Sequence, residues 1–173
     1  MHDYPDEQVA FAALRGPIRL EDALFTARKS NRIAPLQVVR HDRVLGAAHI
    51  RSAALHANRA QAEGRMHAKS LEVEFVRYLA GERQISDALA KMGLPDSKEG
   101  SDGAVVVALG PKRMDALQHF VHTLGLVEDD GLAAATPTKL SAFGVTKEML
   151  DATTPGKAND VVLEMVAAVD LMR

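Results

Sequence analysis

The chain has 173 residues and a formal net charge of −2. A chain of this length usually folds around one core, so we expect residues 1–173 to form a single domain. Because it contains no cysteine, disulfides, thiolate metal sites and a cysteine nucleophile are excluded. The absence of cysteine suits a reducing cytoplasm, where we expect the protein. An uninterrupted apolar run such as residues 104–109 is far too short to cross a bilayer, so no membrane contact is expected.

The first part of the chain predicts strands that alternate with helices. Residues 9–14 favour a strand that ends at Gly16-Pro17, and the residues after it favour a helix because apolar side chains recur at helical spacing. Pro35 lacks the N–H group that a sheet requires, so it can only open the next strand, residues 36–40. An alanine-rich helix is expected over residues 47–62, with Gly64 after it.

The second half predicts one further strand and several helices. Residues 104–109 are all apolar and include three valines, which is typical of a strand buried on both faces. Helices are expected after Gly110-Pro111 and over residues 138–143, 146–152 and 158–172, with loops at residues 94–103 and 128–131. This order predicts an α+β (mixed α/β) fold in which helices cover one small sheet of three or four strands.

The most informative segment is residues 68–93, which predicts two helices separated by one glycine. Apolar residues recur at helical spacing on both sides of Gly81, and glycine commonly supplies the left-handed residue that ends a helix. Arg83 and Gln84 are expected in the first turn of the second helix, where free N–H groups could receive an anion such as phosphate. Glu74 and Arg77, three residues apart, are expected to form an ordinary surface ion pair.

This segment also resembles a known family. The shared residues resemble those of the small kinase-binding regulatory subunit of the KEOPS complex, and they are Lys69-Ser70, Glu74-Phe75, Tyr78-Leu79-Ala80-Gly81, Arg83-Gln84-Ile85, Ala88-Leu89 and Gly93. KEOPS makes the threonylcarbamoyl adenosine modification on transfer RNA. The resemblance implies a non-catalytic subunit that binds and activates the kinase-like ATPase of the complex. It also implies that the subunit holds the single-stranded 3′ CCA end of transfer RNA.

Three residues of this segment are candidate RNA contacts. Lys69 begins the first helix, whereas Arg83 and Gln84 begin the second, so the two cations are expected on the order of 15 Å apart. One phosphate could not bridge that distance, but a short strand of nucleotides could touch both cations. The alternative is structural, because Arg83 could pair with Glu82 or Asp87, and Gln84 could cap a carbonyl.

Positive charge is concentrated in residues 28–69, which contain nine basic residues and two acidic ones. That segment carries +7, so the remainder carries −9, and such segregation suggests one face for a polyanion. Within it, the helix over residues 47–62 presents a polar stripe that could hold RNA, and the residues that we predict as RNA contacts there are His49, Arg51, Ser52, His56 and Arg59. Alternatively, the stripe is a solvated helix face, and the basic residues pair with acids from elsewhere.

The final helix carries a broad face of valine and methionine. Most of this face should belong to the core, but it exceeds what one sheet face can cover, and an exposed remainder would dock a partner. The candidate docking residues are Val162, Met165, Val166, Val169 and Met172. The resemblance implies that the partner is the small lobe of the kinase-like ATPase.

Two other functions stay open at this point. A small enzyme could use His49, His56 or His119 as a general base, and a protein–protein adaptor without an RNA role could meet an acidic partner through the basic face. His119 and His122 have a spacing that metal sites use, but no third ligand lies nearby in the sequence. We therefore predict no metal, no cofactor and no catalytic residue.

Overall fold

The computed structural model describes residues 1–97, 99–154 and 156–172. Its centre is one antiparallel sheet of five strands, in the order β1-β2-β4-β3, with β5 paired to β2 beside β1. The strands are β1 (His2–Tyr4), β2 (Val9–Ile18), β3 (Leu36–Arg40), β4 (Ser101–Leu109) and β5 (Val127–Glu128).

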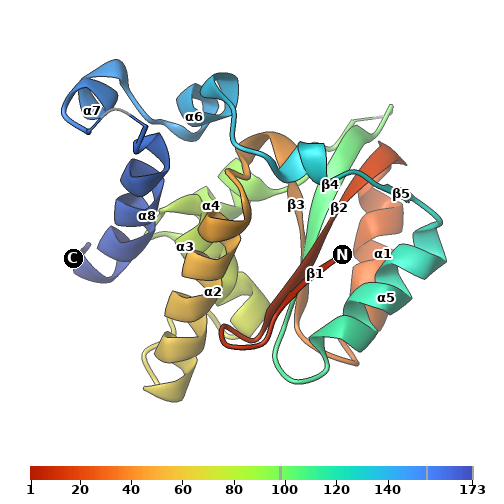
Figure 1. The fold of residues 1–173 in the computed structure, drawn as a ribbon. Coiled ribbons are helices and arrows are strands. Elements are labelled where there is room, and N and C mark those ends of the chain that lie inside the picture. The colour runs from red at the N-terminus through yellow and green to blue at the C-terminus, as the bar shows by residue number, and fades with distance from the viewer. Residues whose placement is uncertain (98, 155, 173) are drawn as a thin grey trace.

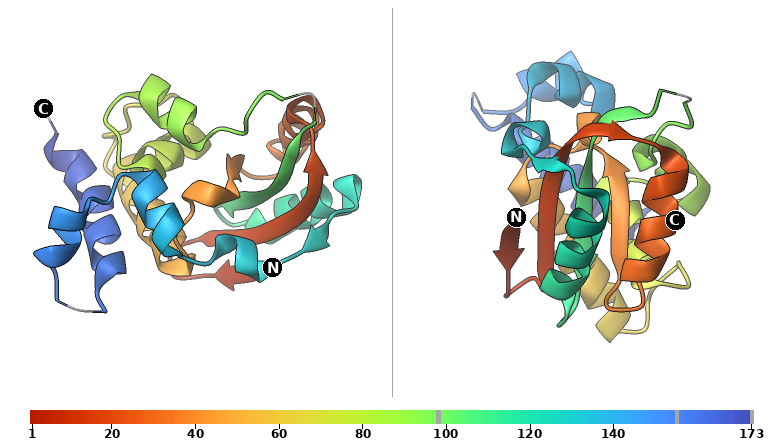
Figure 2. Two further views of the ribbon diagram at one scale, coloured as in Figure 1. Left: turned by 90° about the horizontal axis from the view of Figure 1, so that it is seen from above. Right: turned by 90° about the vertical axis from the view of Figure 1, so that its right-hand side faces the viewer.

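Helices cover both faces of this sheet (Figures 1 and 2). One face is covered by α1 (Leu20–Ser30) and α5 (Arg113–Leu124), and the other by α2 (Ala47–Ala62), α3 (Leu71–Ala80) and α4 (Ile85–Met92). The last helices, α6 (Pro137–Phe143), α7 (Lys147–Asp151) and α8 (Ala158–Ala168), extend this second layer, and α8 packs on α2 and α3. Short 3-10 turns follow β3, β5 and α8, and they are η1 (His41–Arg43), η2 (Asp130–Ala133) and η3 (Val169–Leu171).

The central strand β4 is buried on both faces, as its apolar run predicts. Val105 and Val107 pack with the core under α2 and α3, whereas Val106 and Ala108 pack with the core under α1 and α5. Alternate side chains of a strand point to opposite faces, so a strand between two helical layers needs apolar residues at every position. The sheet is therefore the partition between two hydrophobic cores.

The α+β prediction is confirmed, with more strand structure than expected. The additional strands β1 and β5 are only three and two residues long, too short for any periodic pattern, and both pair with the outer side of β2. Gly16-Pro17 does not end β2. The pairing of β2 with β4 shifts register between Arg15 and Ile18, and Gly16 lies in this irregular part with a φ of +139°. β2 then continues to Ile18.

The helix bounds follow the expected ones closely in the middle of the chain and less closely at its end. α2 has the bounds expected from its alanine-rich pattern. The final helix is shorter than the predicted 158–172, because α8 ends at Ala168 and tightens into η3. Within the described residues, no helix combines the length and the apolar character needed to cross a membrane.

Candidate functional site

The turn between α3 and α4 has the predicted glycine at its centre. Gly81 adopts the left-handed conformation, with φ +66°, and ends α3. Gln84 is the residue just before α4, and Arg83 precedes it, so both lie outside the helix rather than in its first turn. Both side chains are exposed, and a ligand could reach them from solvent.

A buried ion pair lies between the two ends of α3. The side chains of Glu74 and Arg77 are 0% and 2% exposed and bond to each other, so the expected surface pair is wrong. Glu74 Oε2 also accepts hydrogen bonds from the backbone N–H groups of His67, at 3.0 Å, and Ala68, at 2.7 Å. Arg77 Nε donates to the carbonyl oxygen of Arg83 at 2.9 Å. The pair therefore fixes the loop before α3 and the turn after it.

The sequence contained a signal for this pair. Leu71, Phe75 and Tyr78 define the inward face of α3, and Glu74 lies between them on that face. The helical spacing of these residues places the Glu74 carboxylate on the buried face, where it needs a partner, and Arg77 is the cation within reach.

The ion pair also sets the distance between two of the predicted RNA contacts. Lys69 follows Ala68 directly, and Arg83 supplies the carbonyl that Arg77 binds, so both positions are anchored to one rigid helix. Lys69 lies just before α3, which begins at Leu71, and the 10 residues of the helix span about 15 Å. Both side chains are exposed, and the ion pairs within the described part of the chain use other cations.

The predicted stripe along α2 is interrupted, because His49 belongs to the core. Its side chain is buried against Phe143, Nδ1 accepts from the N–H of Leu45 at 3.2 Å, and Nε2 donates to the carbonyl of Leu79 at 2.8 Å. Burial lowers the pKa of His49 to about 4, despite the hydrogen bond to Leu79, so the ring is neutral near pH 7. His49 is therefore unavailable as an RNA contact, and this prediction is corrected.

The other residues of the stripe differ in how free they are. Arg59 is exposed, and Ser52 is partly exposed. Arg51 donates to Glu7 at 2.5 and 3.0 Å, so its charge is already paired. His56 stacks on the ring of Tyr78, with the two centroids 5.4 Å apart. Arg59 is thus the one cation of the stripe that has no ion-pair partner in the described part of the chain.

The basic segment as a whole does not form one face. Arg28 and Lys29 lie on α1, and Arg32 just after it, which places them on the opposite side of the sheet from α2 (Figure 1). Within the same segment, Arg40 and Arg65 also pair with carboxylates. Charge that is adjacent in the sequence is therefore divided by the sheet and partly neutralised.

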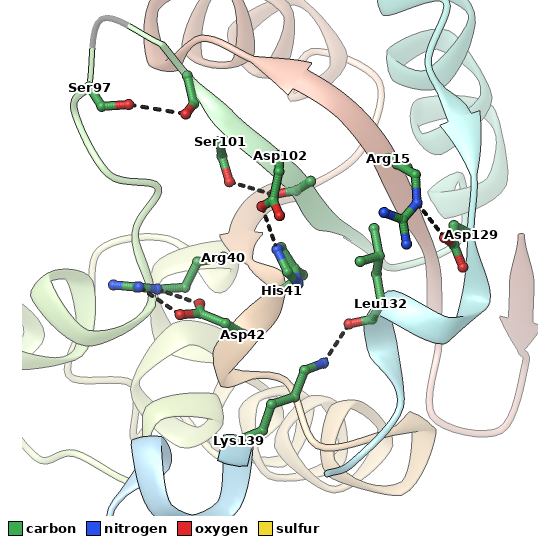
Figure 3. Close-up of polar contacts among 12 residues, drawn as sticks. Arg15, Arg40, His41, Asp42, Ser97, Ser101, Asp102, Asp129, Leu132 and Lys139 are labelled. Atoms are coloured by element: carbon green, nitrogen blue, oxygen red, sulfur yellow. Dashed lines mark hydrogen bonds and ion pairs between the residues drawn. The ribbon is translucent and has the colours of Figure 1, made fainter.

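A group of polar contacts joins the elements at one end of the sheet (Figure 3). Arg40 donates to both oxygens of Asp42, at 2.6 and 2.7 Å, and His41 Nε2 lies 2.8 Å from Asp102 Oδ1. Lys139 donates to the carbonyls of Leu132 and Val44, at 2.6 and 3.2 Å, and burial lowers its pKa. These bonds join η1, β4, η2 and α6. The cations Arg40 and Lys139 are therefore bound within the protein and stabilise the fold.

The C-terminal face is mostly covered by the protein itself. Val162, Val166 and Val169 are buried in the core under α2 and α3, so the prediction that they dock a partner is corrected. One helix with a wide apolar stripe can bury that stripe completely when it packs between two other helices. Met165 is partly buried, and Met172 is exposed.

Sequence reasoning missed two other sets of exposed apolar side chains. Leu171 is 81% exposed beside Met172, and Met149 of α7 is also exposed near α8. Away from them, Leu24 and Leu89 border an apolar groove between α1, α4 and the edge strand β3. Helical periodicity places these residues on a face, but only packing shows that the face is uncovered.

Comparison with protein families supports a kinase-binding role. A model of the family described as kinase binding protein CGI-121 matches residues 19–166, from the start of α1 into α8. The chain belongs to the CGI-121 family. The description of the family supports a kinase-binding regulatory role, and its match includes the whole α3–α4 segment. A search of curated proteins found no match to this chain.

Loss of one member of the buried ion pair should strongly destabilise this CGI-121 protein. Glu74→Gln leaves Arg77 charged and buried without its partner, which typically costs about 3–5 kcal/mol. Glu72→Gln is the matched control, because Glu72 is on the same helix and partly exposed. Urea unfolding followed by circular dichroism measures both free energies of unfolding, and equal losses in the two variants would contradict the assigned role.

The buried His49 should make the protein less stable in acid. Its pKa falls from 6.5 to about 4 on folding, so the unfolded chain binds a proton between these values that the folded chain does not. The free energy of unfolding should therefore decrease as the pH drops from 6.5 to about 4. The variant His49→Gln should lose that part of the pH dependence, whereas His122→Gln, at an exposed position, should keep it. Urea unfolding at a series of pH values tests this, and parallel profiles for His49→Gln and the wild type would refute it.

Proposed function

We propose that this protein is a non-catalytic subunit of the KEOPS complex. It would bind and activate the kinase-like ATPase of the complex and help to recruit transfer RNA, through its 3′ CCA end, for threonylcarbamoyl adenosine modification. The observation that carries the proposal is the CGI-121 match over residues 19–166. Such a subunit contributes by positioning, because it raises the local concentration of RNA at a catalytic centre that lies in another subunit.

The proposed kinase surface is the exposed apolar part of the C-terminal region. It combines Met165 and Met172, which the sequence singled out, with Leu171 and Met149. Exposed apolar side chains are a common basis for docking, because their burial in a complex removes them from water.

The proposed RNA surface is narrower than the basic segment suggested. It uses Lys69 and Arg59 at one end of the α2–α3 pair, and Arg83 and Gln84 at the other, all of them exposed. A single strand that runs along α3 could contact both ends, since the helix between them is about 15 Å long. Because Glu74 and Arg77 hold both ends, the positions are preorganised, and less conformational freedom is lost on binding.

The two alternatives differ in how well they agree with the structure and the family match. In the histidine-dependent enzyme, His49 would have to give up hydrogen bonds from both ring nitrogens, and His119 Nδ1 is 2.9 Å from the hydroxyl of the buried Ser30. The adaptor without an RNA role agrees equally well with the kinase-binding family. Binding of transfer RNA by the purified chain is the observation that separates the adaptor from the main proposal.

The kinase surface is tested with two charge-introducing variants and a pull-down with the kinase-like ATPase of the same organism. Leu171→Glu should reduce capture about tenfold or more, because it places a charge in an apolar interface. Leu24→Glu, on α1 at the apolar groove beside the edge strand β3, is the control and should leave capture unchanged. If Leu24→Glu alone loses capture, the C-terminal surface is rejected and the groove beside β3 is the kinase surface instead.

The RNA surface is tested by mobility shift with transfer RNA at several salt concentrations. Lys69→Ala and Arg83→Ala should each weaken binding about threefold to tenfold and reduce the salt slope by about one phosphate contact. Arg28→Ala removes an equally exposed cation on the other side of the sheet and should have little effect. Equal binding of transfer RNA with and without its 3′ CCA would reject end recognition, and no binding at all would leave only the adaptor.

A further inference from the structure

One carboxylate near the C-terminus is bound by side chains from three other segments. Asp170 of η3 accepts a hydrogen bond from the hydroxyl of Tyr78 on α3 at 2.6 Å. Arg65, in the loop between α2 and α3, donates to the same oxygen at 3.4 Å. His56 Nδ1 of α2 lies 3.4 Å from the other oxygen. Three potential donors from different parts of the fold thus converge on one small anion.

The charges at this cluster are suited to an anion. Partial burial acts to raise the pKa of Asp170, but the hydrogen bond from Tyr78 and the nearby side chains of His56 and Arg65 lower it overall, so the carboxylate is ionised. Burial, with the hydrogen bond to Asp170, raises the pKa of Tyr78 to about 12, so its hydroxyl keeps its proton as a donor. Glu63 also lies beside the cluster and binds Arg65, and the charge of Glu74 acts on Tyr78.

The donors are not fully used by Asp170. Nδ1 of His56 is buried and has no hydrogen bond of good geometry to any residue that the structure describes. The bond from Arg65 is long, at 3.4 Å, and Arg65 is shared with Glu63. A carboxylate has two oxygens in one plane, whereas a phosphate group presents more oxygens in a tetrahedron and carries at least as much charge. A phosphate would therefore satisfy donors that Asp170 leaves without a good partner.

We propose that His56, Arg65 and Tyr78 form a phosphate-binding site that the chain's own Asp170 occupies in the free protein. A ligand phosphate displaces the Asp170 side chain, and the C-terminal turn thus competes with the ligand. The inference rests on the proposed function only for the source of the phosphate, which is then the backbone of the bound RNA. The site lies on the α2–α3 pair and includes His56 of the predicted polar stripe.

Access to this site does not require the core to open. The side chains of Asp170 and Arg65 are 30% and 41% exposed, so one face of the cluster meets solvent. Val169, the neighbour of Asp170, is buried and keeps η3 in place while the Asp170 side chain moves. Arg59 lies one turn beyond His56 on α2 and is exposed, so a second phosphate of the same strand could be bound there.

The test compares Asp170→Asn with Glu164→Gln in the full chain. Both substitutions remove one negative charge near the C-terminus, but Glu164 lies on the α7 side of α8, away from the cluster. Asp170→Asn should bind inorganic phosphate and a short single-stranded RNA about threefold or more tighter than the wild type. Glu164→Gln should change the affinity for either ligand by less than about 1.5-fold. Isothermal titration at fixed salt measures the phosphate, and fluorescence anisotropy measures the RNA. Equal gains in the two variants, or no gain in Asp170→Asn, would overturn the proposal.

A second comparison shows whether Asp170 covers Arg65 in particular. Arg65→Gln should weaken phosphate binding several-fold in the Asp170→Asn background and much less in the wild-type background, where Asp170 already occupies the donor. The same loss in both backgrounds would refute competition. If Asp170→Asn does not fold, the NMR signals of the His56 and Tyr78 rings in the wild type should shift on addition of phosphate while those of His119 stay fixed. Absence of that shift would reject the site.

The two ligands distinguish this proposal from the RNA function. Tighter phosphate binding by Asp170→Asn without any RNA binding would support the site and reject the RNA role. If the protein binds RNA and Asp170→Asn changes neither RNA binding nor phosphate binding, the RNA role is supported and the phosphate site is rejected.

Discussion

The buried pair of Glu74 and Arg77 is the constraint on which the arrangement of the candidate surfaces depends. Two charges removed from water are tolerated only when their remaining donors and acceptors are also satisfied. Glu74 meets this need with the N–H groups of residues 67 and 68, and Arg77 meets it with the carbonyl of residue 83. The chemistry that makes the pair acceptable inside the protein is therefore the same chemistry that fixes both ends of α3, and it places Lys69 and Arg83 at a set distance.

The sheet exerts the second constraint, because it separates the protein into two cores. Helices α1 and α5 cover one face and α2, α3 and α4 cover the other, so basic residues that follow one another in the sequence end on opposite sides (Figure 1). Several of the remainder meet carboxylates. The protein therefore has no broad basic face in its described part, and the proposed RNA contact depends on a few positioned side chains. The kinase-binding character of the CGI-121 family does not depend on this charge, since apolar surface can support it.

Local patterns predicted most of the elements, whereas their environments could not be predicted in the same way. Helical spacing located α2, and the run of valines identified β4 as a strand buried on both faces. The strands β1 and β5 have too few residues for a pattern and form because β2 offers an edge to pair with. His49 has the spacing of a surface stripe, yet it lies in the core because Leu45 and Leu79 offer partners for both ring nitrogens. The valines of α8 are covered by α2 and α3, a contact between segments about a hundred residues apart in the chain.

The sequence alone determined the fold class, the bounds of α2, the glycine that ends α3 and the likeness to a kinase-binding family. These properties follow from the spacing of nearby residues and from residue types with special backbone conformations. Both depend only on residues that are close together in the sequence. Only the tertiary structure decided which polar residues are buried, which cations are neutralised, and that Asp170 meets His56, Arg65 and Tyr78. Burial and charge pairing depend on residues that are far apart in the sequence and meet only in the folded protein. Local sequence patterns therefore do not predict them.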